Sequence, residues 1–172
     1  MDYAAATPLD RRVLQSMLPF LKDAFGNPSS LHVEGRYAKE AVESARKDVA
    51  HVLSATPDEI FFTGSGTESI ALVLHGIAKL YPEGHIVTIS IEHAAVLENA
   101  RALQDAGYKV TIADAELTGI VDPKKIEAAI LDNTVLVSVM YVNNEVGSIQ
   151  PLSEIARVIR RQRTRRKEAS IE

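Results

Sequence analysis

Short β-rich runs and helix-like apolar patterns alternate along most of this 172-residue chain. Continuous β-branched and aliphatic runs predict strands at residues 60–63, 86–90, 108–112 and 134–140. Apolar residues recurring every three or four positions predict helices at residues 67–80, 95–106, from 122 onward, and 152–162. Alternating strands and helices indicate an α/β fold, with a mostly parallel sheet and helices on both of its faces.

The N-terminal third reads as helical, without a strand of its own. Residues 13–21 form a helix pattern that Pro19 ends or kinks. Apolar residues between positions 38 and 52 recur at helical spacing and predict one buried stripe. Residues 56–59 have the capping-box order and predict one short turn. The later helix at 67–80 is apolar on nearly every side, so we expect it to be deeply buried.

The composition is that of a globular protein, with 46% hydrophobic and 24% charged residues. No apolar run reaches transmembrane length and no basic-then-apolar leader is present, so we expect a soluble, cytoplasmic protein. The chain has no cysteine, which excludes a disulfide framework, a thiolate metal site and a thiol nucleophile from it.

The net charge of −4 is unevenly distributed. Residues 157–172 contain seven Arg or Lys against two Glu, on an otherwise acidic chain. Such a basic segment can bind nucleic acid, but no aromatic residues are interleaved with the arginines and no nucleic-acid-binding motif accompanies them. We therefore interpret it as a solvated helix end, and we expect neither nucleic acid nor a membrane as a partner.

Polar clusters follow three of the predicted strands. They lie at residues 63–68, 90–93 and 141–145. The carboxyl ends of parallel strands are where α/β proteins gather their binding sites. Three clusters at such positions predict one site at that edge of the sheet.

The first cluster, Gly64-Ser65-Gly66-Thr67, has more than one interpretation. A strand–turn–helix junction aims backbone N–H groups and a helix N-terminus at one point, which suits a phosphate. Glycines can equally serve a tight turn alone. The cluster also half-matches a dinucleotide fingerprint, in which Ser69 replaces the third glycine and Glu92 stands where a ribose-binding acid belongs.

The other two clusters are similarly open. His93 is either a surface or packing residue, or an aromatic ring that stacks over a flat cofactor ring and also moves protons near neutral pH. Asn143 and Asn144 are either turn residues or hydrogen-bonding partners of a ring oxygen or a carboxylate.

Taken together, the chain resembles the pyridoxal-phosphate-dependent cysteine desulfurases of the class V aminotransferase type that serve iron–sulfur cluster assembly. The resemblance runs from Asp2 to about Arg163. It is carried by five motifs in order, namely Asp2-Tyr3-Ala4-Ala5-Ala6-Thr7-Pro8, Gly26-Asn27-Pro28-Ser29-Ser30 with His32, Thr63–Ser69, Glu92-His93-Ala94-Ala95-Val96-Leu97 and Val142-Asn143-Asn144-Glu145-Val146-Gly147.

The resemblance implies the N-terminal half of a fold-type-I large domain with pyridoxal phosphate as cofactor. Gly66 and Thr67 would hold the phosphate, and His93 would stack on the pyridine ring and act catalytically in proton transfer. Asn144 would bond the ring hydroxyl. The family usually has alanine at the position of Gly66, a difference of small consequence if only the backbone N–H is used.

The family reaction removes sulfur from L-cysteine, giving L-alanine and a persulfide on the enzyme. The resemblance further implies a homodimer and a sulfur-acceptor scaffold protein as a partner. The reaction needs a Schiff-base lysine, an aspartate at the pyridine nitrogen and a mobile cysteine, all of which fall beyond the end of this chain. No lysine here is expected to reach the clusters, so we expect the chain to be inactive alone.

We interpret residues 1–163 as part of that domain and residues 164–172 as a polar basic tail, in a truncated or frame-shifted product or a deliberately cut chain. The family's missing strands would leave residues 60–63 without neighbours and residues 134–140 with an open apolar edge. Poor solubility or partial folding follows. The rival functions are a nucleotide-binding, Rossmann-like oxidoreductase domain, using Gly64, Gly66 and Glu92, and a non-catalytic interaction fragment.

Overall fold

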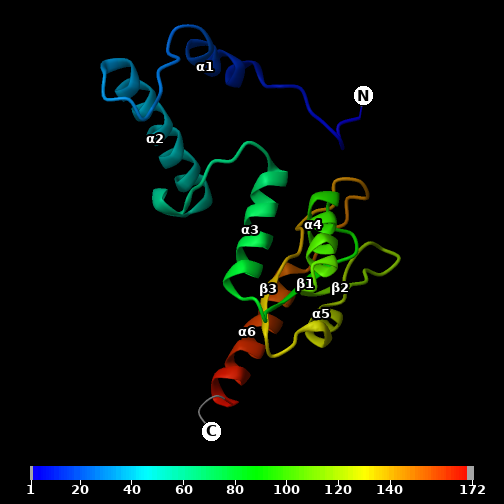
Figure 1. Cartoon of the computed structure of the whole chain (residues 1–172). Coiled ribbons are helices and arrows are strands. Elements are labelled where there is room, and N and C mark those ends of the chain that lie inside the picture. Colours follow the sequence, from blue (N-terminus) through cyan, green and yellow to red (C-terminus); the bar gives the residue numbers. More distant parts are fainter. Residues whose placement is uncertain (1, 170–172) are drawn as a thin grey trace. The chain divides into compact units, whose positions relative to one another are not determined.

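The computed structural model describes residues 2–169 and divides into two compact units, Met1–Phe62 and Thr63–Glu172. The first unit is helical (Figure 1). Its elements are α1 (Arg11–Lys22), α2 (Val33–Leu53) and a 3-10 helix (Pro57–Glu59).

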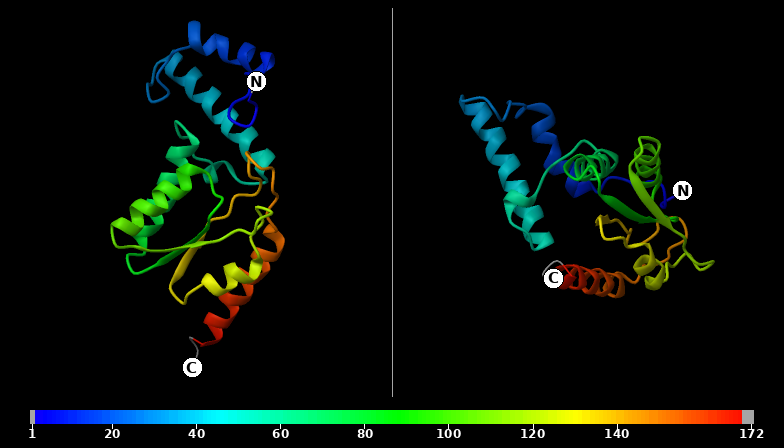
Figure 2. Two further views of the ribbon diagram at one scale, coloured as in Figure 1. Left: turned by 90° about the vertical axis from the view of Figure 1, so that its right-hand side faces the viewer. Right: turned by 60° about the horizontal axis from the view of Figure 1, so that its bottom comes forward.

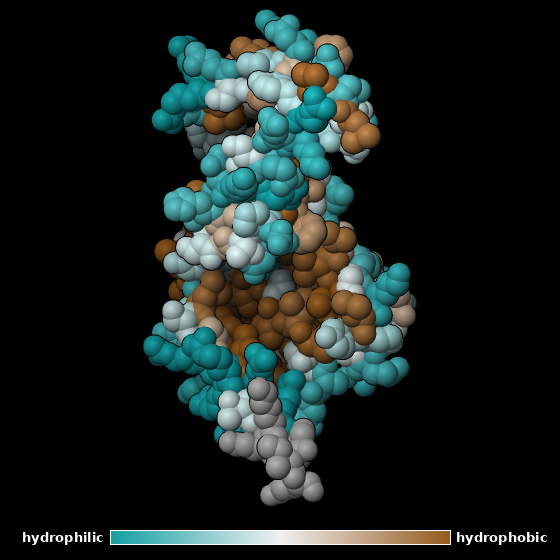
Figure 3. All heavy atoms as spheres, turned by 90° about the vertical axis from the view of Figure 1, so that its left-hand side faces the viewer, coloured by the Kyte–Doolittle hydropathy of each residue, from teal (hydrophilic) through white to brown (hydrophobic). Residues whose placement is uncertain are grey.

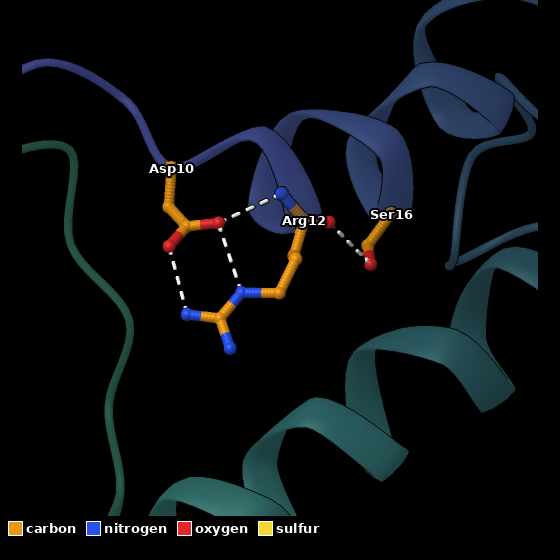
Figure 4. A network of polar contacts seen from close by, with 3 residues as sticks. All are labelled: Asp10, Arg12 and Ser16. Atoms are coloured by element: carbon orange, nitrogen blue, oxygen red, sulfur yellow. Dashed lines mark hydrogen bonds and ion pairs between the residues drawn. The ribbon is translucent and has the colours of Figure 1, made fainter.

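The start of α1 is fixed by its capping residue. Asp10 accepts the backbone N–H of Arg12 at 2.8 Å, which satisfies one of the unpaired donors of the first turn. The Arg12 guanidinium returns to the same carboxylate at 2.8 and 3.1 Å, and Ser16 donates back to the Arg12 carbonyl (Figure 4). Pro19 lies inside the helix, which continues to Lys22 rather than ending at the proline.

The first unit has little buried interior. The Phe20 and Tyr37 rings are stacked with centroids 6.1 Å apart, joining α1 to α2. The predicted buried stripe of α2 is wrong for most of its length, because only Ala38 of the stripe is buried, whereas Ala45 is exposed, Val49 is 37% exposed and Val52 is 80% exposed. The predicted capping box is confirmed at Thr56 and Glu59.

The second unit contains the sheet. Its helices are α3 (Gly66–Leu80), α4 (Ala94–Asp105), α5 (Pro123–Ala129) and α6 (Leu152–Ala169), and its strands are β1 (His85–Ile89), β2 (Lys109–Ala113) and β3 (Thr134–Val137). The strand order is β2-β1-β3, and both pairings are parallel. The predicted α/β class with a parallel sheet is therefore confirmed.

Helices cover both faces of this sheet (Figure 2). All five residues of β1 are buried, as expected for a strand with neighbours on each side and helices on each face. Its side chains alternate, so that Ile86 joins the apolar cluster with Leu74 of α3, while Val87 and Ile89 join the opposite cluster with Ile126 of α5. The sheet is the middle layer of three.

Two predictions about this region are wrong. Residues 60–63 form no strand, because no neighbouring strand pairs with them in the described part of the chain. Helix α3 is not deeply buried, since among its residues only Leu74 is fully buried and Leu72 is 62% exposed. The missing strand agrees with the expectation that residues 60–63 would have no neighbours, whereas the burial predicted for α3 assumed neighbours that residues 2–169 do not supply. Strand β3 also stops at Val137, short of the predicted residue 140.

Helix α6 extends beyond the predicted residue 162 to Ala169, so the described part of the expected basic tail is helical. Residues 170–172 of that tail lie outside the described residues. Arg161 pairs with Glu127 of α5 at 2.8 Å, and Arg166 donates to the Thr134 carbonyl of β3 at 3.0 Å. Two of the arginines of α6 therefore hold the helix against other elements of the second unit. Among the described residues, no helix is long and apolar enough to cross a bilayer.

Candidate functional site

The turn before α3 is built by its own hydroxyl and carboxylate groups. Ser65 has extended backbone angles and its Oγ accepts the Glu68 N–H at 3.1 Å, so it is the N-cap of the helix. Glu68 reaches back to accept the Gly64 N–H at 2.6 Å. Thr63 shares a 2.6 Å hydrogen bond with Ser69. These contacts fix the shape of the turn and leave the backbone N–H groups of the first two helical residues unused.

Those two donors belong to the predicted residues Gly66 and Thr67, the first residues of α3. Within residues 2–169, the N–H groups of Gly66 and Thr67 have no hydrogen-bond partner. They add to the positive end of a 15-residue helix, an arrangement that favours an anion. A Cβ on Gly66 would meet nothing within 4 Å, so the alanine usual in the resembled family would fit here.

His93, the second predicted site residue, is the N-cap of α4. Its Nδ1 accepts the Ala95 N–H at 3.1 Å. An accepting Nδ1 carries no proton, which leaves Nε2 as the ring's protonated nitrogen. The ring is therefore held at the start of the helix, with its other nitrogen pointing away from this contact.

Asn144, the third predicted position, lies in the loop after β3. The neighbouring Asn143 shapes that loop, because its Oδ1 accepts the N–H groups of Glu145 and Val146 at 2.9 Å each. Gly147 closes the turn with a φ of 72°, in the left-handed region that glycine tolerates best.

Two long-range hydrogen bonds join the His93 turn to the Asn144 loop. Asn143 donates Nδ2 to the Ile91 carbonyl at 2.9 Å, and Glu92 accepts the Met140 N–H at 2.6 Å. The segments that carry His93 and Asn144 therefore meet beyond the carboxyl ends of β1 and β3, as the sequence predicted.

Helix α3 reaches the same edge of the sheet. It leads directly into β1 and α4 leads directly out of it, so both helices run antiparallel to that strand. His75 of α3 and Asn99 of α4 share a 2.8 Å hydrogen bond, which sets the two helices side by side. The N-terminus of α3, with Gly66 and Thr67, consequently lies on the side of the sheet where β1 ends.

Glu92 has a role that the sequence analysis missed. The residue is only 8% exposed, and burial raises the pKa of its carboxyl, although the N–H groups of Met140 and His93 act in the opposite direction. A buried carboxylate that holds Met140 is poorly placed to bind a ribose, which removes the main support for the oxidoreductase alternative. The sequence offered no signal for this contact, since its partners are 48 residues apart.

The arrangement can bind a phosphate at α3, present an imidazole at α4 and offer an amide after β3. Lys79 lies in the last turn of α3, at the far end from Gly66. No group of three His, Cys, Asp or Glu residues suitable for a metal occurs in the described part of the chain.

Comparison with protein families gives a match to the aminotransferase class-V model over residues 1–165. The chain is 43% identical over 160 residues to the cysteine desulfurase IscS of Dictyoglomus turgidum, covering 92% of this chain and 41% of that protein. It is 48% identical over 163 residues to the cysteine desulfurase IscS of Rickettsia bellii, covering 93% of this chain and 40% of that protein. The chain thus spans about two fifths of the length of these relatives.

Solved structures give the same picture. A NifS-like protein superposes with a TM-score of 0.91 at 40% identity, covering 94% of this chain and 45% of the other. The structure described as SspA in complex with cysteine superposes with a TM-score of 0.86 at 41% identity, covering 91% of this chain and 46% of the other. The expected fold-type-I likeness therefore holds along nearly the whole chain.

Proposed function

Since this chain belongs to the class-V aminotransferase family, we propose that it is the part of a cysteine desulfurase that binds the phosphate and one ring face of pyridoxal phosphate. The observation that supports this most directly is the pair of unpartnered backbone donors, Gly66 and Thr67, at the N-terminus of α3. They lie on the edge of the sheet where the His93 turn and the Asn144 loop meet.

Each residue has a distinct task in this proposal. The Gly66 and Thr67 N–H groups and the Thr67 hydroxyl bind the phosphate dianion, which the dipole of α3 also favours. The His93 ring covers one face of the pyridine, and its Nε2 donates or takes the proton that moves during catalysis. Asn144 hydrogen-bonds the ring hydroxyl. Bound pyridoxal phosphate supplies the electron sink for this chemistry.

The substrate, the partners and the location of the whole enzyme belong to the same proposal. L-cysteine is the expected substrate, with L-alanine and a persulfide as products for iron–sulfur cluster assembly or other sulfur transfer. A homodimer, a sulfur-acceptor scaffold and a cytoplasmic location complete it, although one relative is named as a mitochondrial protein of Schizosaccharomyces pombe. Residues 1–172 contain no cysteine, and we expect no lysine among the described residues to reach the cofactor, so we expect non-covalent binding and no turnover.

Equilibrium dialysis with pyridoxal phosphate and with pyridoxal tests the proposal. We expect saturable one-to-one binding of pyridoxal phosphate, and binding of pyridoxal weaker by about tenfold or more, because charge-assisted hydrogen bonds contribute about 1.5–3 kcal/mol. Thr67→Val removes the hydroxyl at nearly constant size and should weaken pyridoxal phosphate binding by roughly tenfold. Its matched control, Thr164→Val, removes a hydroxyl from α6 and should change nothing.

Equal affinity for the two ligands, or an unchanged affinity in Thr67→Val, would contradict the phosphate site. Borohydride reduction followed by peptide mapping tests the absence of an anchor. A single lysine that becomes stoichiometrically labelled would overturn the statement that binding is non-covalent.

A further inference from the structure

Gln150 is a buried polar residue outside the three clusters that make up the candidate site. One face of the second unit leaves apolar side chains of α3, β3 and α6 open around a hollow (Figure 3). In the same unit, Gln150 is only 2% exposed. Glutamine is mostly found at protein surfaces, and a buried amide destabilises the fold unless it is hydrogen-bonded. The burial of Gln150 therefore points to a specific set of partners.

Both ends of the Gln150 amide bind the backbone of the segment between β2 and α5. The Oε1 atom accepts the N–H of Val121 at 2.9 Å, and the Nε2 atom donates to the carbonyl of Gly119 at 2.7 Å. These partners lie 29 and 31 residues before Gln150 in the chain. The side chain thus joins the segment that follows β3 to the segment that follows β2.

The segment that Gln150 binds is fixed to the core of the second unit. Val121 is 0% exposed and belongs to the apolar cluster that contains Ile89, the last residue of β1. Glu116, in the preceding turn, pairs with Lys125 of α5 at 2.7 Å. The partners of Gln150 are therefore held by the sheet and by the helix that covers it.

The backbone of Gln150 closes the loop that carries Asn144. The Gln150 N–H donates to the Tyr141 carbonyl at 2.8 Å, and an antiparallel bridge joins the two residues next to this pair. Residues 141–150 therefore form a hairpin that carries Asn144 near its tip and ends at Gln150.

The two legs of this hairpin are held by different contacts. The first leg is held at the end of β1, where Met140 and Asn143 make their long-range hydrogen bonds. The returning leg is held by the side chain of Gln150. Ser148 of the returning leg also packs closely on Gly119, because a Cβ added to this glycine would lie 3.1 Å from the Ser148 Oγ. Gln150 and Gly119 therefore form one joint between the hairpin and the segment after β2.

We propose that Gln150 is a positioning residue for Asn144, because its side chain holds the hairpin of residues 141–150 in place beside the candidate site. The inference rests on the proposed function, in which Asn144 hydrogen-bonds the ring hydroxyl of pyridoxal phosphate. The amide of Gln150 is engaged by the backbone of Gly119 and Val121, so it acts on the cofactor only through the hairpin. Its effect is accordingly specific for the ring hydroxyl, whereas the phosphate is bound at α3.

Gln150→Met tests the joint in the absence of cofactor. Methionine has nearly the length of glutamine but makes neither hydrogen bond. In amide hydrogen exchange of the ¹⁵N-labelled chain, we expect the N–H groups of Val121, Asn143 and residue 150 to exchange at least about tenfold faster in the variant. The control Gln104→Met removes a glutamine that donates to the Val110 carbonyl of β2 at 3.0 Å, and it should leave these amides unchanged.

Ligand selectivity tests whether the joint acts through Asn144. The wild type should bind pyridoxal phosphate about tenfold more tightly than the analogue that lacks the ring hydroxyl, and Asn144→Ala should bind the two about equally. We expect Gln150→Met to lose most of this preference and to keep the preference for pyridoxal phosphate over pyridoxal. A general loosening of the fold would weaken the binding of all three ligands alike, and Gln104→Met should retain both preferences.

Gly119→Ala perturbs the joint from its other side and replaces Gln150→Met if that variant does not fold. The added Cβ approaches Ser148, and the φ of 73° is strained for a residue with a side chain. We expect the same pattern of faster exchange in the hairpin and a lost preference for the ring hydroxyl.

Three results would overturn the proposal. One is faster exchange at Val121 alone, with the amides of the hairpin unchanged. Another is an intact preference for the ring hydroxyl in the variant used, and the third is a uniform loss of affinity for all three ligands. If the wild type binds no pyridoxal phosphate, the proposed function fails, and the exchange measurement still decides whether Gln150 holds the hairpin.

Discussion

Glu92 links the two loops of the candidate site through one short hydrogen bond. Its carboxylate accepts the Met140 N–H at 2.6 Å, and the adjacent Asn143 amide binds the Ile91 carbonyl. His93 follows Glu92 directly, so the buried carboxylate orients the turn that presents the imidazole. His93 and the Asn143–Asn144 pair could be singled out because they follow strand-like runs, and the resemblance to the family then implied Asn144. Glu92 could not be assigned this role, because burial depends on segments far along the chain.

The pH dependence of stability tests the role of Glu92. Because burial raises the pKa of its carboxyl, the folded state binds this proton more tightly than the unfolded chain, whose glutamates titrate near pH 4.3. The stabilising effect of this tighter proton binding is complete below that pH and is lost as the pH rises through the folded pKa. As the pH rises from about 4.5 to 7, the wild type should therefore lose unfolding free energy relative to Glu92→Gln, which does not titrate. Urea unfolding of both proteins at each pH measures this difference. A difference that stays constant across this range would contradict the account.

At the scale of elements, β1 organises the sheet, and His85 at its start ties all three strands together. Its ring nitrogens lie 2.8 Å from the hydroxyls of Thr134 in β3 and Thr111 in β2. The residue is 1% exposed. The imidazole is thus a cross-strand bridge at the end of the sheet away from the candidate site.

His85 predicts a second, opposite pH effect. Burial lowers the pKa of its ring, and nearby Lys109 lowers it further. The stability that His85 contributes is complete above about pH 6.5, the usual histidine pKa, and is lost as the pH falls through its lower folded value. Wild type should lose more unfolding free energy than His85→Gln between about pH 7.5 and 5, since glutamine hydrogen-bonds without titrating. Equal losses of unfolding free energy in the wild type and in His85→Gln would contradict a contribution from the titration of His85.

The elements also show what the sequence could predict. Helix α4 and its stop at Gly107 followed from local chemistry, because Gly107 has a φ of 87° that glycine adopts readily. Strand pairing is not local. Residues 60–63 have a strand-like composition but pair with no strand in the described part of the chain, and apolar residues of α3 such as Leu72 stay exposed. Predictions failed where the pattern required neighbours that residues 2–169 do not supply.

At the scale of the whole molecule, the two units differ in their interiors. The second unit has two apolar clusters, one on each side of the sheet. In the first unit, α2 buries only Gly35, Ala38 and Ala50, and α1 buries none of its residues. Large side chains such as Phe25, at 82% exposed, remain open to water. Burial of apolar area is the main source of stability, so the first unit should be the less stable one.

Hydrogen-exchange mass spectrometry tests this difference. We expect amides of α1 and α2 to exchange orders of magnitude faster than those of β1, which is buried along its whole length. Urea unfolding should accordingly show a slope below that typical of a cooperative 172-residue domain. Uniform protection across both units, with one cooperative transition of normal slope, would contradict the account and its expectation of partial folding.

The account depends on the N-terminus of α3, the His93 turn and the Asn144 loop forming one cofactor surface. Titration of the ¹⁵N-labelled chain with pyridoxal phosphate, followed by amide chemical shifts, tests this most directly. We predict saturable shifts at Gly66, Thr67, His93 and Asn144 with a single common affinity, and weaker shifts at Gly66 and Thr67 with pyridoxal. Shifts confined to the lysine-bearing segments, or different affinities at the three positions, would contradict a shared site.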